Sequence, residues 1–302
     1  MSSDIDILIS EVGPRDGLQN TKQFMPTAYK KKWISAAAAA GLREIEVCSF
    51  VPPQLIPQMA DAAEIVAHAL TIPGLHVAAL APNFKGAQRA MQAGVHKLTL
   101  TISVSTAHSL ANVRMTPDEA IASAKKICDF RASLPAGKRP KIESGLSTVF
   151  GCTIEGKVDP AAVIRLAEKF MEAGADELSV ADTVGYANPA QVKSLLKTLF
   201  DALGKDVKVT VHLHDTRGLG IANANAALRH AGIDAEQAKA VTEMDSDSAQ
   251  EAAMTFAKRK RLGPFGSPLA DAKARSRAFS AFVRAGHSYE FARKILNIEP
   301  DD

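Results

Sequence analysis

The stretch AAAAAGLREIEV, residues 36–47, runs from an alanine-rich segment through one glycine into alternating apolar and polar residues. The same kind of junction recurs as AMQAGVHKLTL at 90–100 and as FMEAGADELSV at 170–180. Glycine readily adopts the left-handed conformation that ends many helices, and alternation with a period of two is typical of a strand. Each junction therefore predicts a helix that ends at glycine and leads into a strand.

Seven segments have the composition of short strands, and a segment with helical periodicity follows each one. The expected strands are ILISEV (7–12), LREIEVCSF (42–50), LHVAALAP (75–82), KLTLTISVS (97–105), PKIESGLSTV (140–149), DELSVADT (176–183) and VKVTVHLHDT (207–216). The expected helices lie near residues 26–41, 61–70, 84–93, 117–132, 160–173, 189–202 and 218–230. This alternation predicts an α/β fold with an all-parallel sheet and helices outside it.

The closed eight-stranded barrel is the common form of such a sheet in a chain of 302 residues. An open doubly wound sheet is the competing architecture, but no GxGxxG motif follows the first strand to support it. Where an eighth strand is due, residues 232–263 are instead polar, rich in Ala and Glu, and helical in period. We therefore expect a (β/α)8 TIM-barrel-like domain that lacks the usual eighth strand, residues 1–229, and a helical C-terminal segment, residues 230–302.

The composition limits which classes of partner and which cellular location are expected for the protein. The 36 Lys and Arg against 33 Asp and Glu give a net charge of +3, too little to indicate nucleic acid or an anionic membrane as a partner. The N-terminus lacks a secretory layout, and no apolar run approaches the roughly 18 residues of a spanning helix. A cytoplasmic location is expected. Cys48, Cys128 and Cys152 are far apart and odd in number, so they are predicted to be free thiols.

The residues most suited to chemistry follow the predicted strands, at the end where barrel enzymes build their sites. Arg15 and Asp16 lie side by side in a turn bounded by Gly and Pro, where they would also serve a purely structural role. His212 and His214 are two residues apart on one strand and therefore point to the same face. Two imidazoles on one face suit a divalent metal, although a hydrogen-bonded pair satisfies the same geometry.

Two further strands contribute polar residues. Glu46 and Cys48 are expected to share one face of the second strand, and a glutamate inside a barrel needs a cationic partner, for which Arg15 is the candidate. Ser179, Asp182 and Thr183 lie at the exit of the sixth strand. These three either face the site or simply begin the next loop.

Together, the motifs resemble the hydroxymethylglutaryl-CoA lyase family, within the wider group of metal-dependent TIM-barrel lyases and synthases. The matching motifs are VGPRDGLQN (12–20), IEVCSF with Val51 (45–51), IPQM (56–59), FGCTIEGKV (150–158), ADTVG (181–185) and HLHDTRGLGIANA (212–224). They occur in order over about residues 7–229. VGPRDGLQN is the most specific of them, because the related acyl-condensing synthases are less similar there.

The resemblance implies a role for each matching residue. Asp16, His212 and His214 would bind Mg2+ or Mn2+, Arg15 would stabilise the enolate of the departing acetyl thioester, and Glu46 would orient Arg15. Asp16 or His212 would act as base or proton shuttle. The residues that match weaker substrate contacts are Gln19, Lys22, Asn112, Ser179 and Thr183. The implied substrate is an acyl-CoA, cleaved to acetyl-CoA and acetoacetate, and a homodimer is compatible with the family.

The resemblance ends near residue 229. The family continues with an eighth strand, a glycine-rich loop that carries a general-acid cysteine, and an asparagine that completes the metal shell; no GGCP-like or GNxxTED-like segment follows residue 230 here. Residues 228–298 instead resemble the helical repeats of RecX-type recombination regulators, in LRHAGIDAEQAKAV, FAKRKRLGPFG and FVRAGHSYEFARKIL. The alternative to an enzyme is thus a non-catalytic protein whose tail binds a recombinase or another protein. KRKR at 258–261 would contact phosphates or a partner's acidic groove, or form a solvated helix face, and the solvated face is expected.

Overall fold

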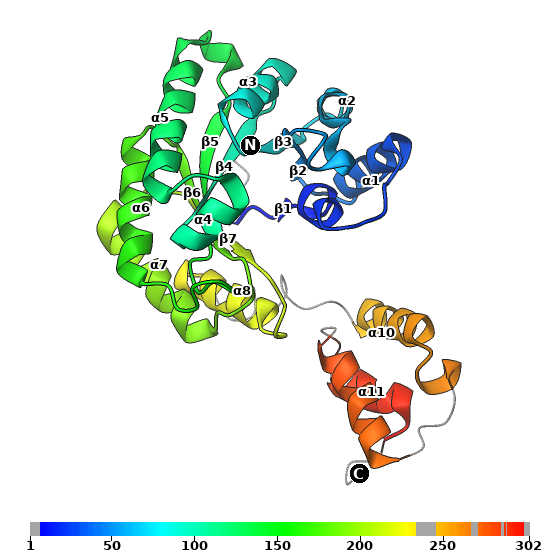
Figure 1. Cartoon of the computed structure of the whole chain (residues 1–302). Helices are drawn as coiled ribbons and strands as arrows, with labels where there is room; N and C mark the ends of the chain where they lie inside the picture. Colours follow the sequence, from blue (N-terminus) through cyan, green and yellow to red (C-terminus); the bar gives the residue numbers. More distant parts are fainter. Residues whose placement is uncertain (1–6, 234–245, 267–270, 285–286, 288, 299–302) are drawn as a thin grey trace. The chain divides into compact units, whose positions relative to one another are not determined.

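The computed structural model describes residues 7–233, 246–266, 271–284, 287 and 289–298 (Figure 1). The chain divides into two compact units. The first runs to Ala181 and includes Leu199–His212, and the second comprises Asp182–Thr198 and the residues from Leu213 onward.

Seven strands form one sheet, and their order in the sheet is their order in the sequence. From the first strand to the sixth, each strand pairs with the next in parallel. The strands are β1 (Ser10–Glu11), β2 (Glu44–Ser49), β3 (His76–Ala81), β4 (Lys97–Ser103), β5 (Lys141–Ser147), β6 (Glu177–Asp182) and β7 (Val209–Leu213). This confirms the predicted α/β, TIM-barrel-like fold with a parallel sheet.

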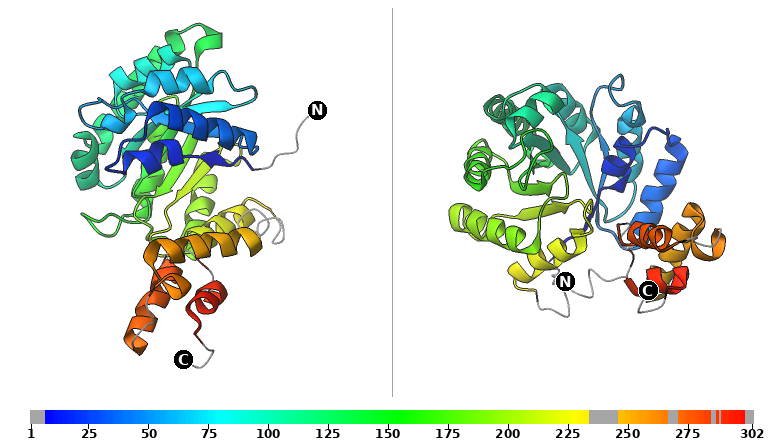
Figure 2. Two further views of the ribbon diagram at one scale, coloured as in Figure 1. Left: turned by 90° about the vertical axis from the view of Figure 1, so that its right-hand side faces the viewer. Right: turned by 60° about the horizontal axis from the view of Figure 1, so that its bottom comes forward.

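Helices alternate with the strands, as the sequence periodicity predicts, and Figure 2 shows the curled sheet inside the ring of helices. Short helices η1 (Gly13–Gly17), η2 (Pro57–Met59) and η3 (Ala136–Lys138) lie in the connections. The longer helices are α1 (Thr27–Ala39), α2 (Ala62–Ala69), α3 (Phe84–Ala93), α4 (Thr106–Val113), α5 (Pro117–Ser133), α6 (Pro160–Glu172), α7 (Pro189–Leu203) and α8 (Gly220–His230).

The predicted glycine junctions are present. Gly41, Gly94 and Gly174 follow α1, α3 and α6, with φ angles of 98°, 84° and 101°. A side chain at these angles would clash with its own backbone, so glycine is favoured where each helix turns into the next strand.

The interior of the first unit is mostly apolar but contains charged side chains on several strands. Ile45 on β2, Leu98 on β4 and Ile142 on β5 are fully buried. The buried charged residues of the sheet include Glu44, Glu46, Lys97 and Glu143. A buried charge requires a partner, so these side chains mark places where the fold depends on ion pairs.

The C-terminal segment is helical and has a hydrophobic cluster of its own. It contains α10 (Ser246–Lys260), η4 (Gly263–Phe265), α11 (Ala272–Arg284) and α12 (Tyr289–Leu296). Phe256, Phe282 and Ile295 are among the residues buried in that cluster. Within the described part of the chain no strand follows Leu213, as expected, whereas residues 234–245 of the predicted helical stretch lie outside it.

The division at residues 229 and 230, and the resemblance of the tail to RecX-type repeats, remain predictions. Among the helices that the structure describes, none combines the length and apolar character needed to cross a bilayer.

Candidate functional site

The turn after β1 is packed so tightly that only glycine fits at its start. The backbone N–H of Gly13 donates to Glu11 Oε1 at 2.5 Å. A Cβ on Gly13 would lie 2.7 Å from that oxygen and 2.9 Å from the ring of Trp33. Pro14, the second residue of η1, restricts the backbone, because its ring holds φ near the helical value. The sequence VGPRDG thus fixes the backbone that carries Arg15 and Asp16.

Arg15 lies between two carboxylates. Its Nε donates to Glu46 Oε2 at 2.5 Å, and its Nη1 donates to Asp16 Oδ1 at 2.7 Å. Burial alone would lower the pKa of Arg15, but the charges of Glu46 and Asp16 and their hydrogen bonds raise it above its usual value. The guanidinium is therefore a permanent, positioned cation, and the predicted pairing of Arg15 with Glu46 is present.

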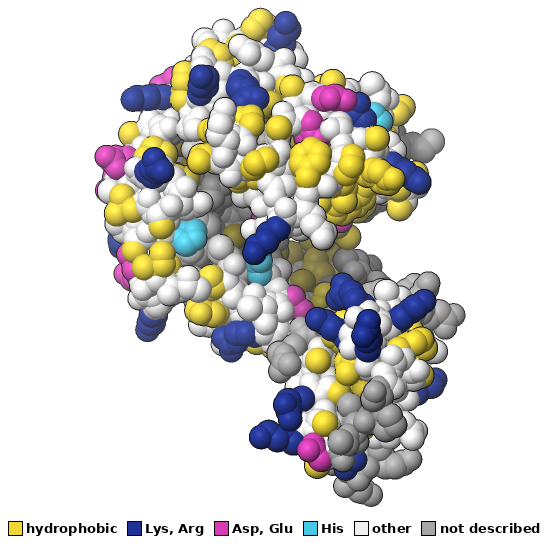
Figure 3. All heavy atoms as spheres, turned by 45° about the vertical axis from the view of Figure 1, so that its right-hand side comes forward, with side chains coloured by type: hydrophobic (Ala, Val, Ile, Leu, Met, Phe, Trp, Pro, Cys, Tyr) yellow, Lys and Arg dark blue, Asp and Glu magenta, His cyan; other side chains and the backbone are white. Residues whose placement is uncertain are grey.

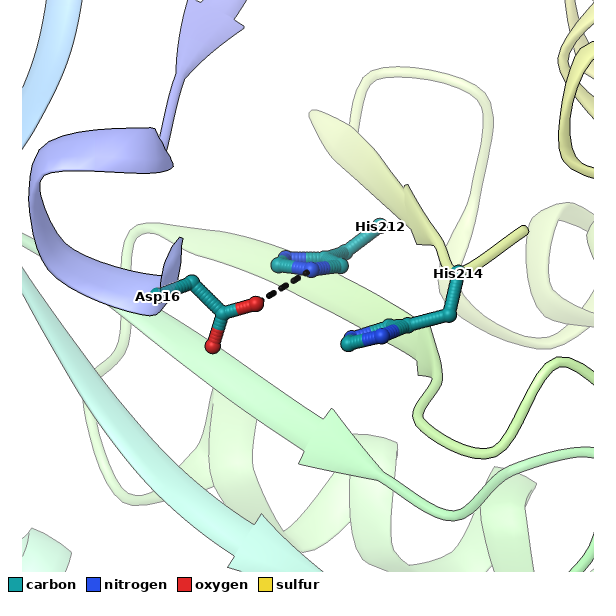
Figure 4. A group of neighbouring side chains, drawn as sticks. All are labelled: Asp16, His212 and His214. Atoms are coloured by element: carbon teal, nitrogen blue, oxygen red, sulfur yellow. Dashed lines mark ion pairs between the residues drawn. The ribbon is translucent and has the colours of Figure 1, made fainter. Parts of the chain in front are cut away.

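Asp16, His212 and His214 point toward one another (Figure 4). One potential ligand atom from each lies within 4.8 Å of the others. Asp16 Oδ2 lies 3.7 Å from His212 Nε2, and both side chains are 22% exposed. His212 belongs to β7, and His214 follows its last residue, so the spacing of two in the sequence places both rings on the same side.

This donor set fits a divalent cation. Carboxylates and imidazoles are both ligands of divalent metal ions in proteins. The neighbouring Arg15 contributes a fixed positive charge, since it contacts Asp16 directly. A cation and a guanidinium at one place are suited to stabilising a negative charge that develops on substrate oxygen atoms.

The predicted common face of Glu46 and Cys48 is wrong. Cys48 Sγ lies 3.6 Å from the carbonyl oxygen of Ala62 in α2, whereas Glu46 contacts Arg15. The pairing of β2 with β3 is irregular between residues 46 and 48, which breaks the alternation of faces. Burial raises the pKa of the Cys48 thiol, so this cysteine is an inert core residue.

The weaker substrate-contact candidates differ in their surroundings. Gln19 Oε1 is buried and has no hydrogen-bond partner among the described residues, as expected of an acceptor kept for a ligand. Ser179 is buried on β6, whereas Lys22 and Asn112 are exposed. Thr183 is half-buried just beyond β6. No contact among the described atoms assigns a role to these five residues.

Asp182 at the end of β6 shapes a loop. Its carboxylate accepts hydrogen bonds from the backbone N–H of Tyr186 at 2.8 Å and of Ala187 at 3.0 Å. The side chain is 1% exposed. Its visible contacts are therefore those of a residue that begins the next loop, which is one of the two roles expected from the sequence.

The structure adds a group of side chains that sequence reasoning missed. Ser103 Oγ lies 2.6 Å from His108 Nδ1 and 2.8 Å from Ser147 Oγ, at the carboxyl ends of β4 and β5. Burial lowers the pKa of His108, which favours the neutral imidazole. A search for His within a few residues of a predicted strand end would have found His108, but not its hydroxyl partners on two strands.

Cys152 lies near this group. It is 1% exposed, and its sulfur accepts hydrogen bonds from Ser105 Oγ at 3.1 Å and from the N–H of Ile154 at 3.3 Å. Burial raises the pKa of Cys152, but the hydrogen bonds from Ser105 and from the backbone of Glu155 and Ile154 lower it overall. The three cysteines are free thiols, as predicted.

Comparison with known proteins gives a consistent match over the barrel. The family model described as HMGL-like matches residues 6–236. A hydroxymethylglutaryl-CoA lyase of Bacillus subtilis is 37% identical over 223 residues, which are 74% of this chain and 73% of that protein. The mitochondrial hydroxymethylglutaryl-CoA lyase of Bos taurus is 38% identical over 226 residues, 74% of this chain and 67% of that protein.

Solved structures agree. An HMG-CoA lyase from Acinetobacter baumannii, in complex with coenzyme A and 3-methylmalate, has a TM-score of 0.70 and 36% identity. The match covers 76% of this chain and 74% of that one. The carboxyl transferase domain of Rhizobium etli pyruvate carboxylase, at 20% identity and a TM-score of 0.55, shares the fold.

Proposed function

This chain belongs to the HMGL-like family, and from that premise we propose that it is a carbon–carbon lyase that cleaves 3-hydroxy-3-methylglutaryl-CoA into acetyl-CoA and acetoacetate. The observation that supports the proposal most directly is the series of contacts from Glu46 through Arg15 and Asp16 to His212, with His214 beside it. This series joins a fixed cation to a set of metal ligands.

As the tertiary hydroxyl loses its proton, the bond between its carbon and the neighbouring CH2 of the thioester breaks, the hydroxyl carbon becomes the ketone of acetoacetate, and the electron pair moves to the thioester oxygen as an enolate. A proton from solvent then converts the enolate to acetyl-CoA. Asp16, His212 and His214 would hold Mn2+ or Mg2+, which when bound lowers the pKa of the substrate hydroxyl. Asp16 or His212 takes the hydroxyl proton, and Arg15 stabilises the charge on the thioester oxygen. Glu46 is a positioning residue, because its carboxylate holds Arg15 by a buried ion pair.

The proposed substrate contacts and the expected turnover rate rest on less direct observations. Gln19, with its buried acceptor oxygen, is assigned to the substrate together with Lys22, Asn112, Ser179 and Thr183. The family's general-acid cysteine and asparagine ligand have no counterpart in this sequence. A positioned acid contributes about 10²- to 10⁴-fold, so the expected turnover is slow but measurable. A homodimer and a cytoplasmic location stay predictions.

The test is release of acetyl-CoA from 3-hydroxy-3-methylglutaryl-CoA by the full-length protein, with Mn2+, with Mg2+ and after chelation. We expect metal-dependent release that Arg15→Gln abolishes, and Mn2+ binding, measured by calorimetry, that His214→Ala weakens by more than about 100-fold. Circular dichroism verifies that each variant is folded. A folded protein that binds Mn2+ but releases no acetyl-CoA under single-turnover conditions would reject the lyase in favour of the non-catalytic alternative.

A further inference from the structure

The helical segment from Ser246 to Ile298 has a hydrophobic cluster of its own. Phe256 of α10, Phe282 of α11 and Ile295 of α12 are buried in one cluster. Phe256 and Phe282 are in edge contact, with ring centroids 5.0 Å apart, and His287 lies 4.9 Å from Phe256. The three helices thus bury their apolar faces against one another, which leaves their polar faces for solvent or a partner.

The charge of this module differs from that of the rest of the chain. Residues 246–298 contain ten Lys and Arg against four Asp and Glu, while the remaining residues contain 26 against 29. Figure 3 shows Lys and Arg side chains gathered over the surface of the helical segment. The exposed cations are Lys258, Arg259, Lys260, Arg261, Lys273, Arg277 and Lys294. The net charge of the whole chain is small, but residues 246–298 are therefore strongly basic.

Ion pairing accounts for none of these cations, and helix stability accounts for only some of them. No carboxylate of the described residues forms an ion pair with any of the seven. Lys258 and Lys260 lie in the last turn of α10, where the helix dipole favours them. Lys273 and Arg275, however, lie in the first turn of α11, where the dipole disfavours a cation. Asp271 offsets this only in part, by accepting the N–H of Ala274 at 2.6 Å.

We propose that the exposed cations of α10, α11 and α12 form a binding surface for the phosphate backbone of nucleic acid. The ten cations of the module are six Arg and four Lys, and the planar guanidinium of Arg matches phosphate oxygens in a bidentate manner. A membrane surface would require a continuous exposed apolar face next to the cations, but most large apolar side chains of these helices are buried, and the exposed Phe265, Val283 and Tyr289 lie on three different elements. Recognition would be independent of base sequence, because it relies on backbone charge.

The experiment uses the full-length protein and a short fluorescent DNA duplex of mixed sequence, with binding followed by anisotropy from about 50 to 200 mM salt. The test variant is Lys258→Gln/Lys260→Gln/Lys294→Gln. We expect it to weaken binding at least about tenfold and to lower the slope of log K against log salt by about one for each lysine that contacts phosphate. These three side chains are exposed, so the variant is expected to stay folded.

The matched control, Lys126→Gln/Lys193→Gln/Lys205→Gln, removes three exposed lysines from the barrel region and should leave binding unchanged. No binding at the lowest salt, or an equal loss in both variants, would overturn the proposal. So would binding to phosphatidylserine vesicles that is tighter than binding to DNA and lost in the tail variant. This inference does not depend on lyase activity. The outcome of the acetyl-CoA assay therefore neither supports nor contradicts it.

Discussion

Two buried glutamates of β2, Glu44 and Glu46, lie two residues apart and belong to different ion clusters. Glu44 Oε1 lies 2.5 Å from Lys97 Nζ, and Glu44 Oε2 lies 3.0 Å from His76 Nδ1. Lys97 also lies 3.2 Å from Glu143. Glu44, His76 and Lys97 are each the first residue of a strand, so this cluster lies at the amino-terminal end of the sheet.

The two clusters lie toward opposite ends of the strands. In the Glu44 cluster Lys97, Glu44 and Glu143 are buried, Thr99 and Thr210 add hydrogen bonds to Glu143, and His76 is 42% exposed. The Glu46 cluster lies toward the carboxyl end, and the Asp16 and His212 side chains are 22% exposed. Because barrel enzymes build their sites at the carboxyl ends of the strands, the Glu46 cluster is in position to meet a substrate, whereas the Glu44 cluster is expected to stabilise the fold.

The largest effect is expected from Lys97→Met. This change leaves Glu44 and Glu143 buried without their cation, and breaking a buried pair in this way costs about 3–5 kcal/mol. Chemical denaturation should show the loss in the free energy of unfolding. The control is Lys141→Met, which removes a 59% exposed side chain from β5 and should cost less than about 0.5 kcal/mol. Similar losses in the free energy of unfolding for both variants would contradict the structural role of the Glu44 cluster.

Arg15→Lys should affect rate rather than stability. A lysine keeps a cation beside Glu46 but loses the fork of N–H groups that contacts Glu46 and Asp16 together. We expect the rate of acetyl-CoA release to fall about 10²- to 10³-fold, the usual cost of one lost charge-stabilising donor. The denaturation midpoint should change little. If the variant lost stability but kept its rate of acetyl-CoA release, the Glu46 cluster would have a structural role like that of the Glu44 cluster.

Low pH is expected to destabilise the protein by protonating Glu44 in the Glu44 cluster. Burial would raise the pKa of Glu44, but the hydrogen bond from His76 and the charge of Lys97 lower it to about 2. Because the folded pKa is below the unfolded one, the unfolded state binds more protons in this range, and the contribution of Glu44 is lost as the pH falls from about 4.5 toward 2. The loss is of the order of 3 kcal/mol.

Denaturation of the native protein and of Glu44→Gln across that pH range measures this contribution. The variant should lose less stability than the native protein between neutral and acid pH, since Glu44 no longer titrates. Parallel curves would show that Glu44 is not stabilised by His76 and Lys97 in solution.

The smallest effect is expected from Glu46→Gln. The amide keeps a hydrogen-bond acceptor for Arg15 Nε but removes the charge, and Asp16 still contacts the guanidinium. The rate should fall about 10- to 100-fold, as for other residues that orient a reacting group. Affinity for Mn2+, measured separately, should not change. An equal loss of Mn2+ affinity would mean that Glu46 supports the metal ligands and not only Arg15.

Local patterns in the sequence determined most of the architecture. Periodicity located all seven strands and the longer helices between them except α4 (Thr106–Val113), and Gly41, Gly94 and Gly174 marked the helix ends, because these signals depend on residues close together in the chain. The spacing of His212 and His214 likewise placed them on one face. The motif VGPRDGLQN indicated that Arg15 and Asp16 belong to the same site, although their roles remain proposals.

Only the tertiary structure decided which charged residues meet. Lys97 and its carboxylates lie on different strands, and so do Ser103 and Ser147, so their contacts depend on how neighbouring strands align. Cys48 left the expected face because one irregular position in β2 reverses the alternation, and no property of the local sequence marks that position. Periodicity acts over a few residues, whereas an ion pair in a barrel depends on strand register and sheet curvature, which the whole chain sets together.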